Sequence, residues 1–151
     1  MVKKDKENLT FSFNSIKGAD SQEFKFQMPQ LHEAQEVVAS SDARWKILCA
    51  GRRFGKSRLG VMLTLITAMQ GKRAWWVAPT YTIARVGWRE IQNAAMGFPE
   101  QFPVNISLVN MEVTFPETGG SIAVRSADTP HRLRGEGLDY SVMDEAAFIK
   151  P

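Results

Sequence analysis

One stretch of the sequence carries the residue types that bind phosphate groups. Residues 50–57 read Ala-Gly-Arg-Arg-Phe-Gly-Lys-Ser, which fits a phosphate-loop pattern of Ala or Gly, four residues, Gly-Lys, and Ser or Thr. The backbone N–H groups of such a turn point at one spot, and the following helix adds its positive dipole end. We expect Gly55 to permit close approach of phosphate, Lys56 to reach the β- and γ-phosphates, and Ser57 to bind Mg²⁺. The predicted ATP and Mg²⁺ site comprises Ala50, Gly51, Arg52, Arg53, Phe54, Gly55, Lys56 and Ser57.

Two arginines, Arg52 and Arg53, stand beside the predicted phosphate cradle. One of them would contact the γ-phosphate and stabilise the charge that develops in the transition state. The alternative is that both are solvated surface side chains.

A second acidic motif follows farther along the chain. Residues 138–145 read Leu-Asp-Tyr-Ser-Val-Met-Asp-Glu, a strand-like run that ends in two carboxylates. Asp144 would hold the Mg²⁺ shell, and Glu145 would orient and polarise the attacking water. Taken alone, such a pair is more often a solvated loop. The preceding phosphate loop favours the catalytic interpretation, because both roles require carboxylates at the carboxyl end of a neighbouring strand.

The elements that must position these residues follow from hydrophobic periodicity and turn residues. Residues 9–16 form either a short strand or a docking arm, and residues 1–25 are read as an N-terminal arm and linker. Residues 26–151 are expected to form a partial P-loop ATPase domain. Its fold class is α/β, with a parallel sheet flanked by helices, a β-hairpin insertion, and truncation after the Asp-Glu strand. The pattern predicts helices from Pro29 to about residue 40, over 56–70 and over 82–96, and strands at 46–50, 74–78, 106–109, 111–115, 121–125 and 140–143.

Composition fits a soluble globular protein. The chain has 151 residues, 44% of them hydrophobic, and a formal net charge of +3, which suits a nucleic-acid partner without requiring one. No stretch is long and apolar enough to cross a membrane. Its one cysteine, Cys49, excludes an internal disulfide, favours a cytoplasmic setting, and is expected to be buried and inert. The four tryptophans are expected to pack in the core.

Four motifs in order resemble the large terminase subunit of tailed bacteriophages. They are the loop 51–57, the strand end Trp76-Val77-Ala78-Pro79-Thr80-Tyr81, Leu133-Arg134-Gly135, and Asp144-Glu145-Ala146-Ala147. The likeness covers roughly Phe26 to the end. Helicases share the phosphate-loop and Asp-Glu motifs, and the Gly-Arg-Arg loop together with Ala-Pro-Thr-Tyr favours terminase.

The resemblance implies an ATPase motor that packages double-stranded viral DNA into a procapsid. It also implies a procapsid portal and a small terminase subunit as partners, a homo-oligomeric ring, and the cytoplasm of a bacterial host. Gln30 or Gln35 would read adenine, since an amide offers both donor and acceptor, although each could be an exposed helix glutamine. Catalytic roles would fall to Lys56, Glu145, Arg52 within its own subunit, and Arg134 as a finger reaching a neighbour's ATP. For Arg134, ordinary loop surface is the alternative.

The sequence departs from the family pattern at its end, since it stops six residues after Glu145. Terminases continue through a coupling motif, further strands and a nuclease domain with clustered acidic metal ligands. We therefore expect no nuclease activity, ATP binding weaker than in an intact domain, and turnover near background. The alternatives are a superfamily 2 helicase-like, nucleic-acid-dependent ATPase and an inactive nucleotide-binding remnant.

Overall fold

The computed structural model describes residues 2–5, 8–14, 23–28, 30–100, 102–135 and 137–150, with side chains from residue 30 onward except at position 132. The chain divides into two compact units, Met1–Met62 and Leu63–Pro151, and each is described by itself.

The first unit begins with a three-stranded antiparallel sheet. Its strands are β1 (Val2–Asp5), β2 (Asn8–Asn14) and β3 (Glu23–Met28), in the order β1-β2-β3. Strand β2 confirms the strand interpretation for residues 9–14, and residues 15 and 16 lie outside the described residues. Its register pairs Phe11 with Phe26 and Phe13 with Phe24, so the aromatic positions of β2 and β3 are aligned.

Two helices follow in sequence. Helix α1 spans Glu33–Ser40 and helix α2 spans Lys56–Met69, so the predicted helices exist, and the first begins later than its pattern indicated. Pro29, where the prediction started that helix, lies outside the described residues. Helix α2 ends before Gly71, whose φ of +80° is the left-handed conformation typical of a glycine just past a helix C-terminus.

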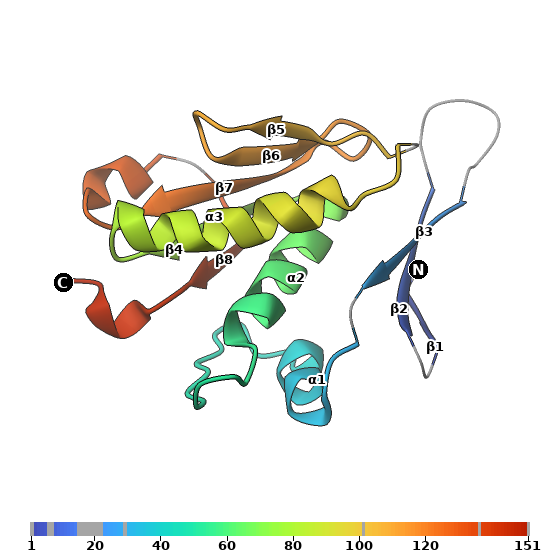
Figure 1. Cartoon of the computed structure of the whole chain (residues 1–151), viewed down its shortest axis with the longest axis horizontal. Helices are drawn as coiled ribbons and strands as arrows, with labels where there is room; N and C mark the ends of the chain where they lie inside the picture. Colours follow the sequence, from blue (N-terminus) through green and yellow to red (C-terminus); the bar gives the residue numbers. More distant parts are fainter. Residues whose placement is uncertain are drawn as a thin grey trace. The chain divides into compact units, whose positions relative to one another are not determined.

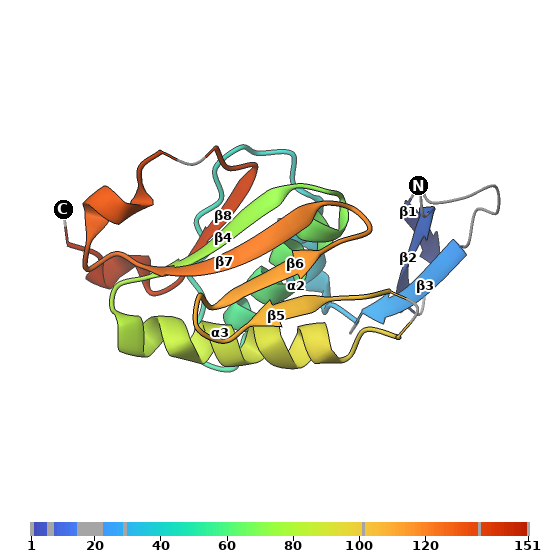
Figure 2. The same cartoon turned by 90° about the horizontal axis from the view of Figure 1, so that it is seen from above.

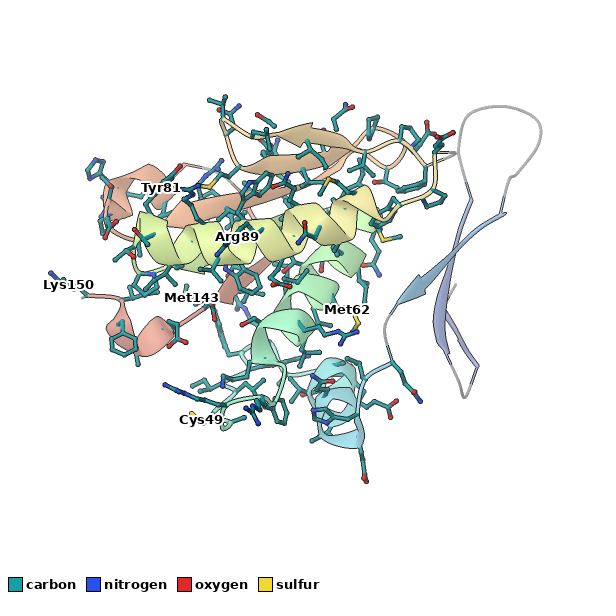
Figure 3. All side chains as sticks on the ribbon, viewed as in Figure 1. Cys49, Met62, Tyr81, Arg89, Met143 and Lys150 are labelled. Carbon is teal, nitrogen blue, oxygen red and sulfur yellow. The ribbon has the colours of Figure 1, made fainter. Side chains whose placement is uncertain are left out.

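The predicted buried strand at residues 46–50 is wrong. No regular structure is assigned there, Ile47 is 94% exposed, and Cys49 is exposed as well (Figure 3). A strand exists only where a neighbour supplies ladder hydrogen bonds. Within the described residues these five pair with no other strand, and so their apolar side chains find no sheet face. The prediction that Cys49 is buried fails for the same reason.

The second unit is built on a mixed five-stranded sheet with the order β5-β6-β7-β4-β8 (Figures 1 and 2). Strands β7, β4 and β8 run parallel, and β5, β6 and β7 form an antiparallel meander. The predicted hairpin is therefore present, and its last strand also joins the parallel sheet. The bounds are β4 (Arg73–Ala78), β5 (Asn105–Ser107), β6 (Glu112–Phe115), β7 (Gly120–Ser126) and β8 (Tyr140–Met143).

Strand β4 lies between β7 and β8 and is buried from Ala74 to Ala78. Such a continuous apolar run is typical of a strand covered on both faces. Its tryptophans, Trp75 and Trp76, are 4% and 0% exposed, which confirms their packing role, as does Trp88 at 5%. Trp45, at 75% exposed, contradicts it, because it precedes the segment that forms no strand.

Helix α3 (Tyr81–Met96) runs along one face of this sheet (Figure 2). Thr80 caps it by accepting a hydrogen bond from the Ile83 N–H at 3.3 Å. Ile91 and Ala95 are buried on its inner face, whereas Val86 is 49% exposed although it is an apolar residue of the same helix. Gly87 occupies that face instead, against the indole of Trp76.

Candidate nucleotide-binding site

The phosphate loop leads from the extended segment into α2 through two left-handed residues. Arg53 has a φ of +67° and Gly55 a φ of +81°. Glycine adopts such a conformation freely, but a residue with a Cβ rarely does. The loop therefore holds a strained residue, Arg53, directly before the Phe54-Gly55 turn, which is a common feature of ligand-binding loops.

Helix α2 begins with backbone donors that its own turns do not use. The Leu59 N–H donates to the Gly55 carbonyl at 2.9 Å and makes the first i to i−4 bond of the helix. The N–H groups of Lys56 and Ser57 precede that bond, and no acceptor for them is recorded within the described residues. Backbone donors at a helix N-terminus, with the positive dipole end behind them, suit a phosphate group.

The Lys56 ammonium is held by the loop itself. It donates to the Ala50 carbonyl at 2.7 Å and to the Gly51 carbonyl at 3.1 Å. These bonds keep the cation folded over the loop rather than extended into solvent. A phosphate oxygen arriving here would meet a positioned charge.

The other predicted loop residues are accessible to solute. Ser57, Arg52 and Arg53 are exposed, while Ala50 and Phe54 are half-buried. The described part of the chain records no ion pair for either arginine. Both guanidinium groups are therefore available to an anion.

Helix α1 contacts the phosphate loop through Gln35 and His32. Gln35 is 5% exposed, and its Nε2 donates to the carbonyls of Phe54 at 3.1 Å and Gly55 at 3.3 Å. The His32 Nε2 lies 3.0 Å from the same Phe54 carbonyl, and its ring meets the Phe54 ring edge to face, with centroids 4.7 Å apart. No local sequence pattern could reveal this role of His32, because its partner lies 22 residues away. Gln30, the other glutamine considered for adenine, is exposed.

In the second unit, the acidic pair directly follows β8 as predicted. The Asp144 N–H donates to the Val77 carbonyl at 2.9 Å, so the parallel ladder with β4 extends to this residue. Asp144 is half-buried, and Glu145 is exposed with a left-handed φ of +50°. Met143, labelled in Figure 3, marks the end of the strand before the pair. The two carboxylates thus lie at the carboxyl end of a parallel sheet, where α/β folds carry their ligand sites.

Arg134 lies in the loop between β7 and β8, after a short 3₁₀ helix η1 (Pro130–Leu133). The loop is anchored by Leu133, which packs against a buried cluster of Trp75, Val77 and Ala123. Arg134 itself is exposed. An exposed guanidinium beside an anchored leucine suits a residue that contacts another molecule.

Asp128 is a further residue whose role the sequence did not reveal. Its Oδ2 accepts hydrogen bonds from the Tyr81 N–H at 3.2 Å and the Ser126 hydroxyl at 2.9 Å. The carboxylate therefore stabilises the N-terminus of α3 and ties the end of β7 to it. An Asp two residues after the end of β7 gives no sequence signal for this contact.

The predicted site residues include oxygen ligands of the type that binds magnesium together with a nucleotide. Among the described side chains, no three His, Cys, Asp or Glu residues gather into a metal-binding group. Magnesium in nucleotide sites is held by one or two protein oxygens together with substrate phosphates. The Ser57 hydroxyl in the first unit and the Asp144 carboxylate in the second are each, taken alone, an oxygen ligand of that kind.

Comparisons with known proteins agree on one family. No family model matches the sequence. The large terminase subunits of Thermus phage G20c and Thermus virus P23-45 are each 28% identical over 136 residues, covering 78% of this chain. The large terminase ATPase domain of Thermus phage P74-26 matches with a TM-score of 0.64 and 26% identity, over 80% of this chain and 55% of that one. The chain is similar in sequence and in fold to the ATPase region of phage terminase large subunits.

This similarity confirms the resemblance and the α/β P-loop-like fold predicted from the sequence. The chain spans 28% of the length of the curated terminase relatives it matches. No helix in the described residues is long and apolar enough to cross a bilayer.

Proposed function

We propose that this chain binds MgATP at its phosphate loop and contributes the ATPase chemistry of a terminase motor that drives viral DNA into a procapsid. The observation that carries the proposal is the phosphate loop itself. Its lysine is folded over the loop carbonyls, and the first N–H groups of α2 have no recorded acceptor in the described chain. Terminase homology supplies the reaction class.

Each site residue receives a role that matches its chemistry. Lys56 and the loop N–H groups bind the β- and γ-phosphates, while Ser57 and Asp144 provide Mg²⁺ ligands. Glu145 orients and polarises the attacking water, and Arg52 stabilises charge on the transferred phosphoryl group. Arg53 is the second cation available for that role. Arg134 is assigned to a finger that acts on the ATP of a neighbouring subunit.

The macromolecular partners follow from the proposed motor. Double-stranded viral DNA is the cargo, and a portal and a small terminase subunit are the protein partners. A homo-oligomeric ring would allow Arg134 of one subunit to serve the next. The setting is the cytoplasm of the bacterial host.

Equilibrium binding of MgATP to the full chain tests the proposal. Lys56→Ala should weaken binding on the order of tenfold or more, because one charge-assisted contact to phosphate contributes about 1.5–3 kcal/mol. Lys72→Ala, which removes an exposed lysine outside the loop, is the matched control and should leave affinity unchanged. Equal affinity for wild type and Lys56→Ala would contradict the proposal.

Glu145→Gln separates binding from hydrolysis. The variant keeps the size of the side chain but lacks the carboxylate that polarises water. MgATP affinity should stay close to wild type, while any phosphate release measured in a coupled assay should fall to background. Release that persists in the variant would remove Glu145 from the catalytic role.

A further inference from the structure

The contact between α1 and the phosphate loop is possible with only one orientation of the Gln35 amide. The amide of Gln35 meets two carbonyl oxygens, which can only accept, and one backbone N–H, which can only donate. Its Nε2 therefore faces Phe54 and Gly55, and its Oε1 accepts the His32 N–H at 3.2 Å. The reversed amide would set donor against donor and acceptor against acceptor.

Every donor of the Gln35 amide is consequently in use. Both Nε2 hydrogens go to loop carbonyls, and the side chain is 5% exposed. Reading the N6/N7 edge of adenine requires a free donor as well as an acceptor. Gln35 has no donor left for a base, whereas Gln30 is exposed and has no recorded partner within the described residues.

The bonds of Gln35 and His32 also determine where the loop N–H groups point. Within a planar trans peptide, the C=O and N–H groups point in opposite directions. Two donors on the Phe54 carbonyl turn the Gly55 N–H away from α1. A donor on the Gly55 carbonyl does the same for the Lys56 N–H. These are the donors that a phosphate group would use.

Gly55 fits this arrangement for a second reason besides its φ of +81°. A Cβ at this position would lie 2.7 Å from the Gln35 Nε2, which is closer than real contacts allow. The glycine of the phosphate loop is therefore matched to the glutamine on α1. A side chain here would displace Gln35 from both carbonyls.

We propose that His32 and Gln35 are positioning residues that hold the phosphate loop in its anion-binding form, and that Gln30 is the glutamine left to contact the base. The assignment rests on the proposed function, since it names how that same site is kept in shape. It also assigns different tasks to the two glutamines: Gln35 positions the phosphate loop, and Gln30 contacts the base.

The experiment measures binding of MgATP, MgGTP and inorganic triphosphate to variants of the full chain. Gln35→Met keeps the side-chain length and removes the amide. It should weaken all three probes by the same factor, on the order of tenfold, and leave the ratio of ATP to GTP affinity unchanged. Gln30→Ala should lower that ratio and leave triphosphate binding at its wild-type value.

Further variants test the histidine and control for folding. His32→Ala removes one of two donors on the Phe54 carbonyl and should lose less affinity than Gln35→Met. His32→Gln, which restores an N–H donor, should recover part of that loss. Gln70→Met alters an exposed glutamine outside the loop and should change nothing. Circular dichroism identifies any variant that fails to fold, and His32→Gln then carries the comparison.

The outcomes distinguish the two proposals. Loss of ATP affinity in Gln35→Met with triphosphate binding intact would make Gln35 the base reader and overturn the assignment. Wild-type affinity of Gln35→Met for all three probes would also overturn it. Failure of the wild-type chain to bind any of the three probes would refute the proposed function itself.

Discussion

Residues 74–78 and 46–50 are both short apolar runs, but only the first forms a buried strand. The first forms most of β4, where Ala74, Trp76 and Ala78 are at most 1% exposed. The second forms no strand, and its Ile47 is 94% exposed. The difference lies in neighbours. Strand β4 pairs with β7 on one side and β8 on the other, whereas the described residues supply no ladder partner for residues 46–50.

An apolar run therefore becomes a buried strand only where two conditions hold. Its N–H and C=O groups need partners on adjacent strands, and its side chains need a covering layer. Strand β4 meets the second condition through α3, which packs over it. Hydrophobicity alone brings neither condition about, so sequence periodicity cannot separate the two runs.

The largest predicted effect concerns the covering of β4. A Cβ on Gly87 of α3 would lie 2.6 Å from the Trp76 Cε2 and closer still to its Nε1. The Trp76 Nε1 is buried and has no hydrogen-bond partner among the described residues. The indole edge that faces Gly87 therefore has no room for an added methyl group. Gly87→Ala should lower the free energy of unfolding by about 1–3 kcal/mol or more through overpacking. Urea denaturation followed by tryptophan fluorescence measures it.

Gly137→Ala is the matched control for that substitution. No atom lies within 4 Å of the added Cβ at Gly137, and its φ is not left-handed. The unfolding midpoint should stay at the wild-type value. If Gly87→Ala were equally neutral, α3 would have room to move away from β4. Close covering by α3 would then not be what distinguishes residues 74–78 from residues 46–50.

The sequence predicted those elements whose pattern is read locally. The apolar runs at 111–115 and 121–125 predicted β6 and β7, which form the hairpin, and the helical pattern over 56–70 predicted α2. The candidate site could be named to the same extent, because the phosphate loop and the Asp144-Glu145 pair are contiguous motifs. The contacts of His32 and Gln35 could not be predicted, because their partners lie 19 to 22 residues away and are backbone carbonyls, which leave no signature in residue type.

An intermediate effect is expected at β8, the outer neighbour of β4. Tyr140 pairs with Ala74, and burial raises the pKa of its phenol above the ordinary value of 10.0. Tyr140 therefore ionises at a lower pH in the unfolded chain than in the folded one. Its contribution to the free energy of unfolding is fully present below pH 10 and is lost as pH rises through the folded-state pKa. The unfolding free energy of wild type should therefore fall more steeply above pH 10 than that of Tyr140→Phe. The other tyrosine, Tyr81, is present in both proteins and cancels.

Equal alkaline slopes for wild type and Tyr140→Phe would contradict this prediction. They would mean that the phenol is as hydrated in the folded chain as in the unfolded one. The pairing of Tyr140 with Ala74 would then leave the phenol more accessible to water than the structure indicates.

The smallest expected effect is at Cys49, within the run that forms no strand. The thiol is exposed, so alkylation by iodoacetamide should proceed in the native protein within about threefold of its rate in denaturant. A comparison protein carries Cys49→Ser together with Val77→Cys, which places one thiol on β4 at a position that is 4% exposed in the wild type. That thiol should react orders of magnitude more slowly, because the reagent reaches it only after local or global unfolding. Protection of Cys49 comparable to that of the β4 thiol would show that residues 46–50 acquire a strand partner in solution, and an apolar run would then be sufficient to recruit one.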